Sequence, residues 1–584
     1  TGRFGTQDKY EKRTNHLLYE YHHVTGLSLL TEKVKQYGAK LCVQIGPGIG
    51  RLGYVDPYTP SYSASAIPCY SFPDLLCKPY EIKDIKLLVR SVGISAALAK
   101  RAEADAVELH AYGGYLLDQF QCSLWNKRTD DYGGDLNGRM KFTLECIAEI
   151  QKTCGKDYPL IVKFTPYHGI PGGTDLPEGV EMAKMFEAAG VHALHVDKGC
   201  YEVWYDMIST VYEPDAHQLE IAAAVKQAVN IPVIAQGKLD KPEIAERALE
   251  EGKTDFVAMG HQMLTDPHWV NKVKTGKNYD IVPCIGCNEC LYHSHLGKMQ
   301  SCAVNPQCMR EDDYPVLPAN EKKSILVVGG GPGGMQAAIT AAQRGFDVEL
   351  WEKDSRLGGT LLAAGAPSFK QDILRYVEYL SNKTYHSNVT VKLNKEANEK
   401  EILRGNFDKV ILATGAKPLM PPIEGIDGQN VKNAISVLLG NEKTGKNVVV
   451  IGGGLVGCET ALHIMEKAEK VTIIEKLGDI LANVQHNRNN DLKLRKMIAD
   501  NNIETICEAR VTSINPNHIE YNKENKTKWV NCDTVVIAVG YINDNALMQA
   551  LEDKIEDLSV IGDAFAPRKV YDAVHEGFHT ARLI

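Results

Sequence analysis

Residues 108–142 read ELHAYGGYLLDQFQCSLWNKRTDDYGGDLNGRMKF, and this stretch decides the fold. The apolar run that leads into it predicts a strand ending at His110. Two glycines follow at 113 and 114, and Tyr115 comes directly after them. Functional side chains of parallel α/β folds gather at the carboxyl ends of strands. His110 and Tyr115 are therefore candidate functional residues.

Short apolar runs alternate with helical patterns on both sides of this stretch. Repeated strand–helix units imply a parallel sheet, either doubly wound or closed as a (β/α)8 TIM barrel. We count six units, two short of a barrel, so we expect the first two strands upstream of Thr1 and an N-terminally truncated chain. The six predicted strands are AKLCVQIG (39–46), ADAVELHA (104–111), PLIVKFTP (159–166), VHALHVD (191–197), IPVIAQG (231–237) and TDFVAMG (254–260).

The 108–142 stretch resembles the Old Yellow Enzyme family of FMN-dependent barrels, and this resemblance favours the barrel over the doubly wound sheet. In that family the histidine donates a hydrogen bond to a substrate carbonyl, and the tyrosine protonates the α-carbon after hydride reaches the β-carbon. The resemblance implies these roles for His110 and Tyr115. An ordinary packing role is the alternative reading of the tyrosine.

The resemblance also implies an FMN site. Gln44 matches the glutamine at the flavin edge, and Lys163 stands where relatives often have an arginine that faces the flavin pyrimidine. The loops AQGKL and AMGHQ match the two that hold the FMN phosphate, and they supply Gly237, Lys238, Gly260 and His261.

Two positions depart from the family pattern. Gly113 stands where many relatives place a second hydrogen-bond donor, and His261 replaces the usual arginine of the phosphate loop. Polarisation of the carbonyl must then use another group or be weaker.

Residues 195–214, HVDKGCYEVWYDMISTVYEP, resemble the clostridial 2-enoate reductases and the bile-acid steroid reductases of gut anaerobes. Dienoyl-CoA reductases have a Trp-His pair near here that supplies a second acid, and this chain has Trp204 and Tyr205. Tyr201 and Tyr205 are walls of the substrate pocket or proton donors, and the wall role is favoured because tyrosines commonly line cavities. We include Tyr205 among the candidate catalytic residues.

Four cysteines follow the predicted barrel, at positions 284, 287, 290 and 302. Three close thiolates and a fourth from a returning segment favour an iron–sulfur cluster, because zinc sites more often pair cysteines two and two. Disulfides are the last choice, because fifteen cysteines without a secretion signal suggest reduced thiols. The order of the domains resembles the trimethylamine dehydrogenase and dienoyl-CoA reductase group. That resemblance implies a 4Fe–4S cluster on Cys284, Cys287, Cys290 and Cys302, with Cys308 as an ordinary thiol.

Two dinucleotide-binding fingerprints come next, each with strand, glycine turn, helix, second strand and terminal acid. The first and the late Gly-Asp pair resemble the FAD site of two-dinucleotide flavoprotein reductases. The second predicts NADH rather than NADPH, because the carboxylate of Glu475 repels a 2′-phosphate. The predicted FAD residues are Gly329, Gly331, Gly334, Glu352, Gly359, Gly562 and Asp563, and the predicted NADH residues are Gly452, Gly454, Gly457 and Glu475.

Length and charge limit the organisation and the partners. A chain of 584 residues is too long to fold around a single hydrophobic core, so we expect several domains. The net charge of −9 gives no reason to expect nucleic acid or an anionic membrane, and the apolar runs are too short for a membrane span. We expect a reducing cytoplasmic setting. The predicted domains are an FMN barrel (1–275), a 4Fe–4S segment and linker (276–320), an FAD domain (321–440 and 541–584) and an NAD(H) domain (441–540).

Together these features predict an NADH-dependent ene-reductase. The resemblance implies electron transfer from NADH to FAD, to the 4Fe–4S cluster, to FMN and finally to a C=C bond conjugated to a carbonyl group. The alternatives are an amine dehydrogenase or desaturase that passes electrons outward to a carrier, and an electron-transfer fragment that is inactive at the barrel. The substrate is a small unsaturated carbonyl compound of open class: enoate, enoyl-CoA, steroid enone or tetrapyrrole. Relatives suggest a homo-oligomer by analogy.

Overall fold

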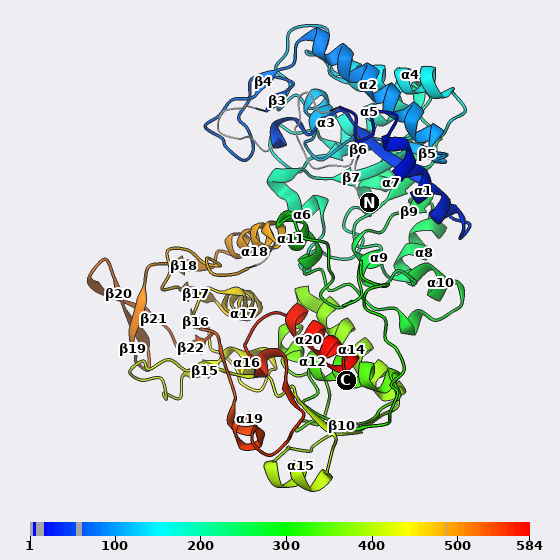
Figure 1. Cartoon of the computed structure of the whole chain (residues 1–584). Helices are drawn as coiled ribbons and strands as arrows, with labels where there is room; N and C mark the ends of the chain where they lie inside the picture. The colour runs from blue at the N-terminus through cyan, green and yellow to red at the C-terminus, as the bar shows by residue number, and fades with distance from the viewer. Residues whose placement is uncertain (1–3, 8–16, 54–60, 486) are drawn as a thin grey trace. The chain divides into compact units, whose positions relative to one another are not determined.

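The computed structural model describes residues 4–7, 17–53, 61–485 and 487–584 (Figure 1). They form two compact units: unit 1 comprises residues 1–209 and 214–259, and unit 2 comprises residues 210–213 and 260–584. Each unit has its own sheets, so each is described by itself.

Unit 1 is built on a parallel sheet of seven strands in the order β1-β2-β5-β6-β7-β8-β9. This is the predicted (β/α)8 class of fold, with strands and helices alternating along the chain. The strands are β1 (Phe4–Gly5), β2 (Cys42–Gly46), β5 (Ala106–Ala111), β6 (Leu160–Tyr167), β7 (Ala193–Lys198), β8 (Val233–Ala235) and β9 (Phe256–Val257), with a separate pair β3 (Tyr62–Ser63) and β4 (Lys78–Pro79).

The first strand corrects the sequence-based strand count. We expected the sheet to begin at residue 39 and the two earlier strands to lie upstream of Thr1. Instead Phe4 and Gly5 form β1, which pairs in parallel with Ile45 and Gly46 of β2. Two residues are too few to show a period in the sequence, so β1 could not be recognised there.

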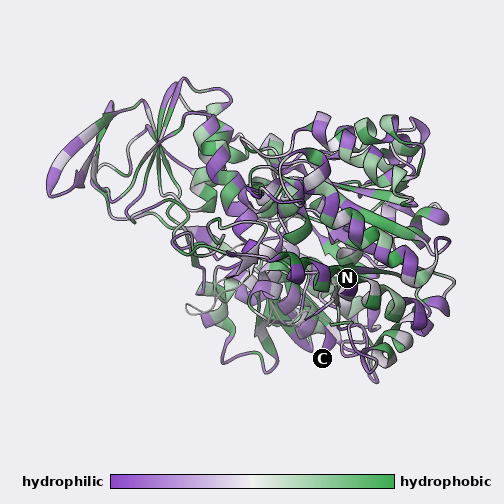
Figure 2. Ribbon diagram, turned by 90° about the horizontal axis from the view of Figure 1, so that it is seen from above, coloured by the Kyte–Doolittle hydropathy of each residue, from purple (hydrophilic) through white to green (hydrophobic). Residues whose placement is uncertain are grey.

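Helices pack on one face of this sheet, and the strands show why. Val107 and Leu109 of β5 and Val162 and Phe164 of β6 are fully buried hydrophobic residues. Figure 2 shows several strands in the hydrophobic colour and helices in mixed colours. The intervening residues point to the other face, because side chains of a strand alternate. The helices of unit 1 are α1 (His23–Lys35), α2 (Ile82–Arg101), α3 (Leu116–Gln121), α4 (Leu136–Cys154), α5 (Leu176–Ala188), α6 (Trp204–Met207), α7 (Leu219–Ala228) and α8 (Pro242–Glu250).

Unit 2 contains two parallel five-stranded sheets, with strand orders β12-β11-β10-β13-β24 and β15-β22-β16-β17-β18. An antiparallel three-stranded sheet, β19-β20-β21, and the pair β14-β23 complete it. The strands are β10 (Ser324–Val328), β11 (Asp347–Trp351), β12 (Val389–Lys392), β13 (Lys409–Leu412), β14 (Ala416–Pro418), β15 (Val431–Asn433), β16 (Asn447–Ile451), β17 (Lys470–Ile474), β18 (Glu504–Ile506), β19 (Arg510–Ile514), β20 (His518–Lys523), β21 (Lys526–Asn531), β22 (Thr534–Ile537), β23 (Tyr541–Asn543) and β24 (Leu558–Val560).

The end of the chain returns to the first of these sheets. Strand β24 pairs with β13, and helix α20 packs closely against α12. A Cβ on Gly577 of α20 would lie 2.2 Å from the carbonyl oxygen of Gly333 in α12, so glycine permits the close crossing. The helices of unit 2 are α9 (His261–Thr265), α10 (Trp269–Lys274), α11 (Glu289–His295), α12 (Pro332–Gln343), α13 (Leu361–Ala364), α14 (Gln371–His386), α15 (Glu399–Gly405), α16 (Ala434–Leu438), α17 (Leu455–Met465), α18 (Arg488–Asp500), α19 (Ala546–Leu551) and α20 (Val570–Arg582).

Two domain boundaries in the structure differ from those that the sequence predicts. Residues 260–275 group with unit 2, because α9 bonds to the cysteine segment through Gln262 Nε2 and the Val282 carbonyl (2.8 Å). Strand β15 pairs with β22, so residues 431–433 belong to the second dinucleotide sheet rather than to the first. None of the helices among the described residues is both long and apolar enough to span a membrane.

Candidate active site and cofactor sites

Polar side chains line the sheet face of unit 1 that is turned away from the helices. Gln44 pairs in register with Glu108, and His110 with Lys163, which in turn pairs with His195. Neighbours in register on a parallel sheet point to the same side, so five polar side chains share one face. Among these, Gln44, Lys163 and His110 are predicted site residues.

Hydrogen bonds join this face into one network. Glu108 accepts from Gln44 Nε2 (2.6 Å) and lies 2.8 Å from His195 Nδ1. The Oε1 atom of Gln236 accepts a hydrogen bond from Lys163 Nζ (2.8 Å) and lies 3.1 Å from His195 Nε2. Glu108, His195 and Gln236 were not predicted from the sequence, because their partners lie 41 to 87 residues away along the chain.

Charge on this face is balanced internally. Burial opposes ionisation of Glu108, but the charge and hydrogen bond of His195, the charge of Lys163 and the hydrogen bond from Gln44 outweigh it and lower its pKa to about 2. Lys163 also forms a 3.1 Å ion pair with Asp197, which is 1% exposed. Its ammonium group lies 4.3 Å from the ring centre of Tyr112. The ammonium group of Lys163 therefore has two carboxylates near it, those of Glu108 and Asp197.

His110 and Tyr115 meet at the carboxyl end of β5, as their sequence positions suggested. His110 is the last residue but one of β5, and Tyr115 is the N-cap of α3. Their rings are perpendicular with centroids 4.5 Å apart. The hydroxyl of Tyr115 lies 2.7 Å from the hydroxyl of Tyr201. Tyr205, the third candidate catalytic residue, is 6% exposed and lies on α6.

A buried pair supports the turn that carries Tyr115. The Gly114 amide donates to Asp118 Oδ2 (2.6 Å), and His168 Nε2 lies 2.9 Å from the same oxygen. The Thr174 amide donates to His168 Nδ1 (2.9 Å), so Nε2 carries the proton and donates to Asp118. Both side chains are fully buried, and the turn is therefore held from its inner side.

Gly113, one of the two departures from the family pattern, has a neighbouring side chain where its own would lie. A Cβ there would lie 2.6 Å from Met207 Sδ, and its φ is +69°. Met207 thus occupies the volume into which a side chain at position 113 would extend.

The two predicted phosphate loops fall in different units. Gly237 has φ +96°, and a Cβ on it would lie 2.7 Å from Gln218 Cγ, so a glycine is required there. Lys238 follows with φ +56° in the left-handed region. Gly260 and His261 belong to unit 2, where Gly260 is the N-cap of α9.

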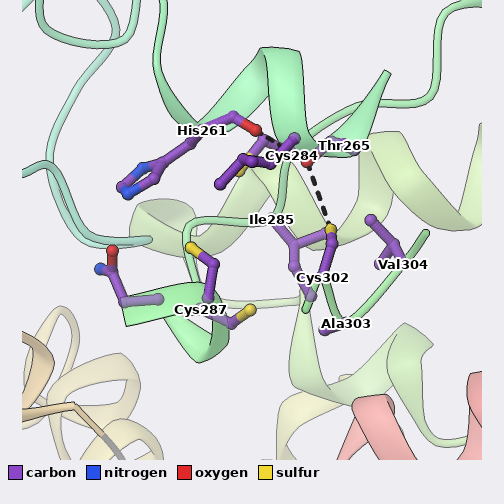
Figure 3. A pocket seen from close by; sticks show the side chains of 11 residues that line it. His261, Thr265, Cys284, Ile285, Cys287, Cys302, Ala303 and Val304 are labelled. Carbon is purple, nitrogen blue, oxygen red and sulfur yellow. Dashed lines mark hydrogen bonds between the residues drawn. The ribbon is translucent and has the colours of Figure 1, made fainter. Parts of the chain in front are cut away.

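The four cysteines surround one cavity of unit 2 (Figure 3). The cavity has an empty volume of about 300 Å³, counted with the space at its mouth. Its lining also includes the predicted phosphate-loop residue His261, whose side chain is drawn in Figure 3 beside the cysteine segment. The lining residues are Cys284, Cys287, Cys290, Cys302, His261, Leu264, Thr265, Ile285, Asn288, Ala303 and Val304.

One of the sulfurs accepts a hydrogen bond from the backbone, and a second lies beside a hydroxyl group. The Gly286 amide donates to Cys284 Sγ (3.4 Å), and Thr265 Oγ1 lies 3.5 Å from Cys302 Sγ. Burial, followed by the neighbouring thiols, raises the pKa of Cys287 and of Cys290 above the ordinary value. Among the described residues, no three Cys, His, Asp or Glu side chains form a site for one metal ion.

Several elements of unit 2 hold the cysteine segment, residues 284–302, in place. Asn288 Nδ2 donates to Asn490 Oδ1 of α18 (2.8 Å), and Asn490 Nδ2 donates to the Gly286 carbonyl (3.2 Å). His575 Nε2 of α20 lies 2.9 Å from the Cys302 carbonyl oxygen. The cysteine segment is therefore bound to both dinucleotide-binding halves of the unit.

The first fingerprint has the geometry of a dinucleotide turn. A Cβ on Gly329 would lie 2.3 Å from the Ala413 carbonyl oxygen, and one on Gly334 would lie 1.9 Å from the Gly329 carbonyl oxygen. Gly331, by contrast, faces open space at the N-terminus of α12, where phosphate binds in such folds. The Gly330 amide donates to Glu352 Oε2 (2.6 Å), so the terminal acid also holds the turn.

Two further predicted glycines lie near the first fingerprint, and one of them is followed by a predicted acid. A Cβ on Gly359 would lie 3.0 Å from Gly331 Cα, so these two predicted residues face each other. Gly562 has φ +62°, and burial raises the pKa of Asp563 above its ordinary value.

The second fingerprint has the same close contacts at its glycines as the first. A Cβ on Gly452 would lie 2.5 Å from the Ala538 carbonyl oxygen, and one on Gly457 would lie 1.8 Å from the Gly452 carbonyl oxygen, while Gly454 faces open space. Glu475 accepts from the amides of Gly453 (2.6 Å) and Leu477 (2.7 Å).

Comparison with known proteins places both halves in families. Residues 5–280 match the NADH:flavin oxidoreductase / NADH oxidase family, and residues 323–577 match the pyridine nucleotide-disulphide oxidoreductase family. A cinnamate reductase of Clostridium sporogenes is 35% identical over 95% of this chain and 86% of its own length. An NADH oxidase of Thermoanaerobacter brockii is 39% identical over 96% of this chain and 87% of its own length.

A solved structure supports the same assignment. A 2-naphthoyl-CoA reductase in complex with 2-naphthoyl-CoA superimposes with a TM-score of 0.92 at 30% identity, covering 100% of this chain and 91% of that one. The match extends through both the barrel and the dinucleotide-binding half. The chain therefore belongs to the NADH:flavin oxidoreductase / NADH oxidase family and is an oxidoreductase of the 2-enoate reductase group, with a pyridine nucleotide-disulphide oxidoreductase domain after the barrel.

Proposed function

We propose that this protein is an NADH-dependent reductase of C=C bonds conjugated to a carbonyl group. The observation that carries the proposal is the pairing of His110 with Tyr115 at the carboxyl end of β5, above a polar sheet face that includes Lys163. His110 would donate a hydrogen bond to the substrate carbonyl, and the Tyr115 hydroxyl would give its proton to the α-carbon.

The residues present fit the cofactors that such a reaction needs. Gln44, Lys163 and the Gly237–Lys238 turn would hold FMN, since amide and cationic groups suit the polar edge and the phosphate of a flavin. Gly331, Gly359 and Glu352 would hold FAD. Gly454 and Glu475 would hold NADH.

The cysteine cavity fits a 4Fe–4S cluster better than a single ion. Cys284, Cys287, Cys290 and Cys302 line one cavity, and the Gly286 amide donates a hydrogen bond to the sulfur of Cys284. A cluster of several metal ions holds its ligands further apart than one zinc ion does. When bound, these groups would supply hydride and single-electron chemistry, and the order that we propose is NADH, FAD, cluster, FMN and substrate.

The substrate class follows from the relatives and from the aromatic site. The related proteins are named as reductases of cinnamate and 2-naphthoyl-CoA, both of which carry a carbonyl group conjugated to an aromatic system. Tyr112, Tyr115, Tyr201 and Trp204 give this site several ring surfaces. We therefore place an aromatic enoate or its CoA thioester first and a steroid enone second.

Anaerobic stopped-flow absorbance tests the proposal. NADH should bleach the flavin absorbance of the holoenzyme, and one class within a panel of enoates, enoyl-CoA esters and enones should restore it. Bleaching of the oxidised flavin by an amine, with the electrons then passing to an external carrier, would favour the dehydrogenase alternative. A purified chain without FMN would favour the electron-transfer fragment.

A further inference from the structure

The hydroxyl groups of Tyr115 and Tyr201 form a hydrogen bond of 2.7 Å, although 86 residues separate them. Tyr115 caps α3, and Tyr201 begins the short 3-10 turn Tyr201–Val203 after β7. Their ring centroids lie 5.5 Å apart at 79°. The contact is therefore directed through the oxygens and is not a stacked packing contact.

The Tyr201 ring is fixed from two sides. Trp204 stacks on it with centroids 5.2 Å apart and a 14° angle between the planes. Tyr70 meets it edge-on at 5.3 Å and donates its own hydroxyl to the Tyr201 carbonyl oxygen (2.9 Å). Contacts from two separate segments leave the Tyr201 hydroxyl little freedom to leave Tyr115.

The neighbouring residue anchors the same turn. Glu202 forms an ion pair with Arg51, whose guanidinium lies 4.6 Å from the Trp125 ring centre. Arg51 is 5% exposed, so this ion pair is largely shielded from water on one side. The turn that presents Tyr201 is thus held by hydrogen bonding, stacking and charge together.

We propose that Tyr201 is a positioning residue for the reduction and acts through Tyr115; this rests on the proposed function above. When the Tyr115 O–H bond breaks and its proton bonds to the substrate α-carbon, negative charge remains on the Tyr115 oxygen. Tyr201 then donates its hydrogen bond to that oxygen, which stabilises the phenolate. A solvent proton afterwards restores Tyr115, and NADH is the two-electron reductant for the overall reaction.

A wall of the substrate pocket is the alternative role, and Tyr201→Phe separates the two. Phenylalanine retains the ring that Trp204 and Tyr70 contact but removes the hydroxyl. If Tyr201 acts through Tyr115, this variant should reduce the rate of flavin reoxidation by the acceptor about 10- to 100-fold. The rate of bleaching by NADH should not change. The pH at which the rate falls should move upward, because the Tyr115 phenolate has lost a donor.

The double variant Tyr115→Phe with Tyr201→Phe gives the sharper result. It should be no slower than Tyr115→Phe alone, because Tyr201 has nothing to stabilise once the phenol is absent. The control is Tyr158→Phe, which removes a hydroxyl that donates to the Ala104 carbonyl (2.9 Å) at the amino end of the strands. It should react at the wild-type rate.

The outcomes distinguish this inference from the proposed function. Wild-type kinetics in Tyr201→Phe, or losses that multiply in the double variant, would overturn the role of Tyr201 and leave the proposed function intact. If Tyr115→Phe reacted at the wild-type rate, or no acceptor reoxidised the wild-type enzyme, both would fall.

Discussion

Met207 Sδ lies 2.6 Å from the point that a Cβ on Gly113 would occupy. Gly113 also has φ +69°, a conformation that costs other residues about 1–2 kcal/mol. Gly113→Ala should therefore lower the unfolding temperature of unit 1 and the rate of acceptor reduction. In a Met207→Ala background the same substitution should cost less stability than in wild type, because only the φ strain remains. An equal drop in melting temperature in the two backgrounds, read by circular dichroism, would contradict this packing.

The low pKa of the buried Glu108 carboxylate predicts how the stability of unit 1 depends on pH. Its pKa is about 2 in the folded protein, below the ordinary value of 4.5, so its contribution to stability is present above pH 4.5 and is lost as pH falls toward 2. The contribution at neutral pH is on the order of 3 kcal/mol. Glu108→Gln should destabilise unit 1 at pH 7 and should differ little from wild type near pH 2. Urea unfolding at several pH values measures the difference, and a gap that does not narrow on acidification would exclude an ionised Glu108.

The two fingerprint acids offer a matched pair of variants. Glu475 accepts hydrogen bonds from the second glycine turn, and Glu352 does the same in the first. Glu475→Ala should raise the KM for NADH about tenfold and reduce the preference over NADPH, since the repulsive carboxylate has gone. Glu352→Ala should instead lower the FAD content of the purified protein. Steady-state kinetics with each nucleotide and cofactor extraction separate the two results, and interchanged effects would mean that the two sites are assigned the wrong way round.

Cysteine variants test the cluster. Cys287 lines the cavity, whereas Cys308 is a buried thiol that does not belong to the cavity lining. Cys287→Ser should lower the content of iron and of acid-labile sulfide below the about four atoms of each per chain expected for wild type. It should also remove the broad visible absorbance that is not due to flavin. Cys308→Ser should retain them. Loss of iron from both variants alike would point to general instability instead of ligand removal.

The sequence predicted the local motifs well and the long-range polar contacts poorly. Each fingerprint lies within about thirty residues, so its strand, turn, helix and terminal acid could be recognised together, and the structure shows the turns closed around Gly329 and Gly452. Two-residue strands such as β1 have no period to detect. The partners of Glu108 and of Tyr115 lie 64 to 87 residues away, so only the folded sheet and the turns at its strand ends bring them together.

The cysteine segment shows the same limit. Its spacing identified the four sulfurs that share a cavity, but not that His261 and Thr265 of α9 complete the lining. The sequence predicts that these residues belong to the barrel, because AMGHQ resembles a phosphate loop of the FMN-dependent barrels. The border changed because the side chains of α9 bond to the residues that follow, and sequence order alone does not reveal that pairing.

The most direct test of the central claim is the origin of the two hydrogens added to the C=C bond. Electrons that pass singly between NADH and the substrate carry no hydrogen with them. The reduced product formed from NADH in D2O should therefore contain two deuterium atoms by mass spectrometry. NADH with deuterium at both C4 positions should leave the product unlabelled in H2O. Deuterium delivered from NADH to the product would contradict the relay, and the absence of any reduced product would contradict the reductase itself.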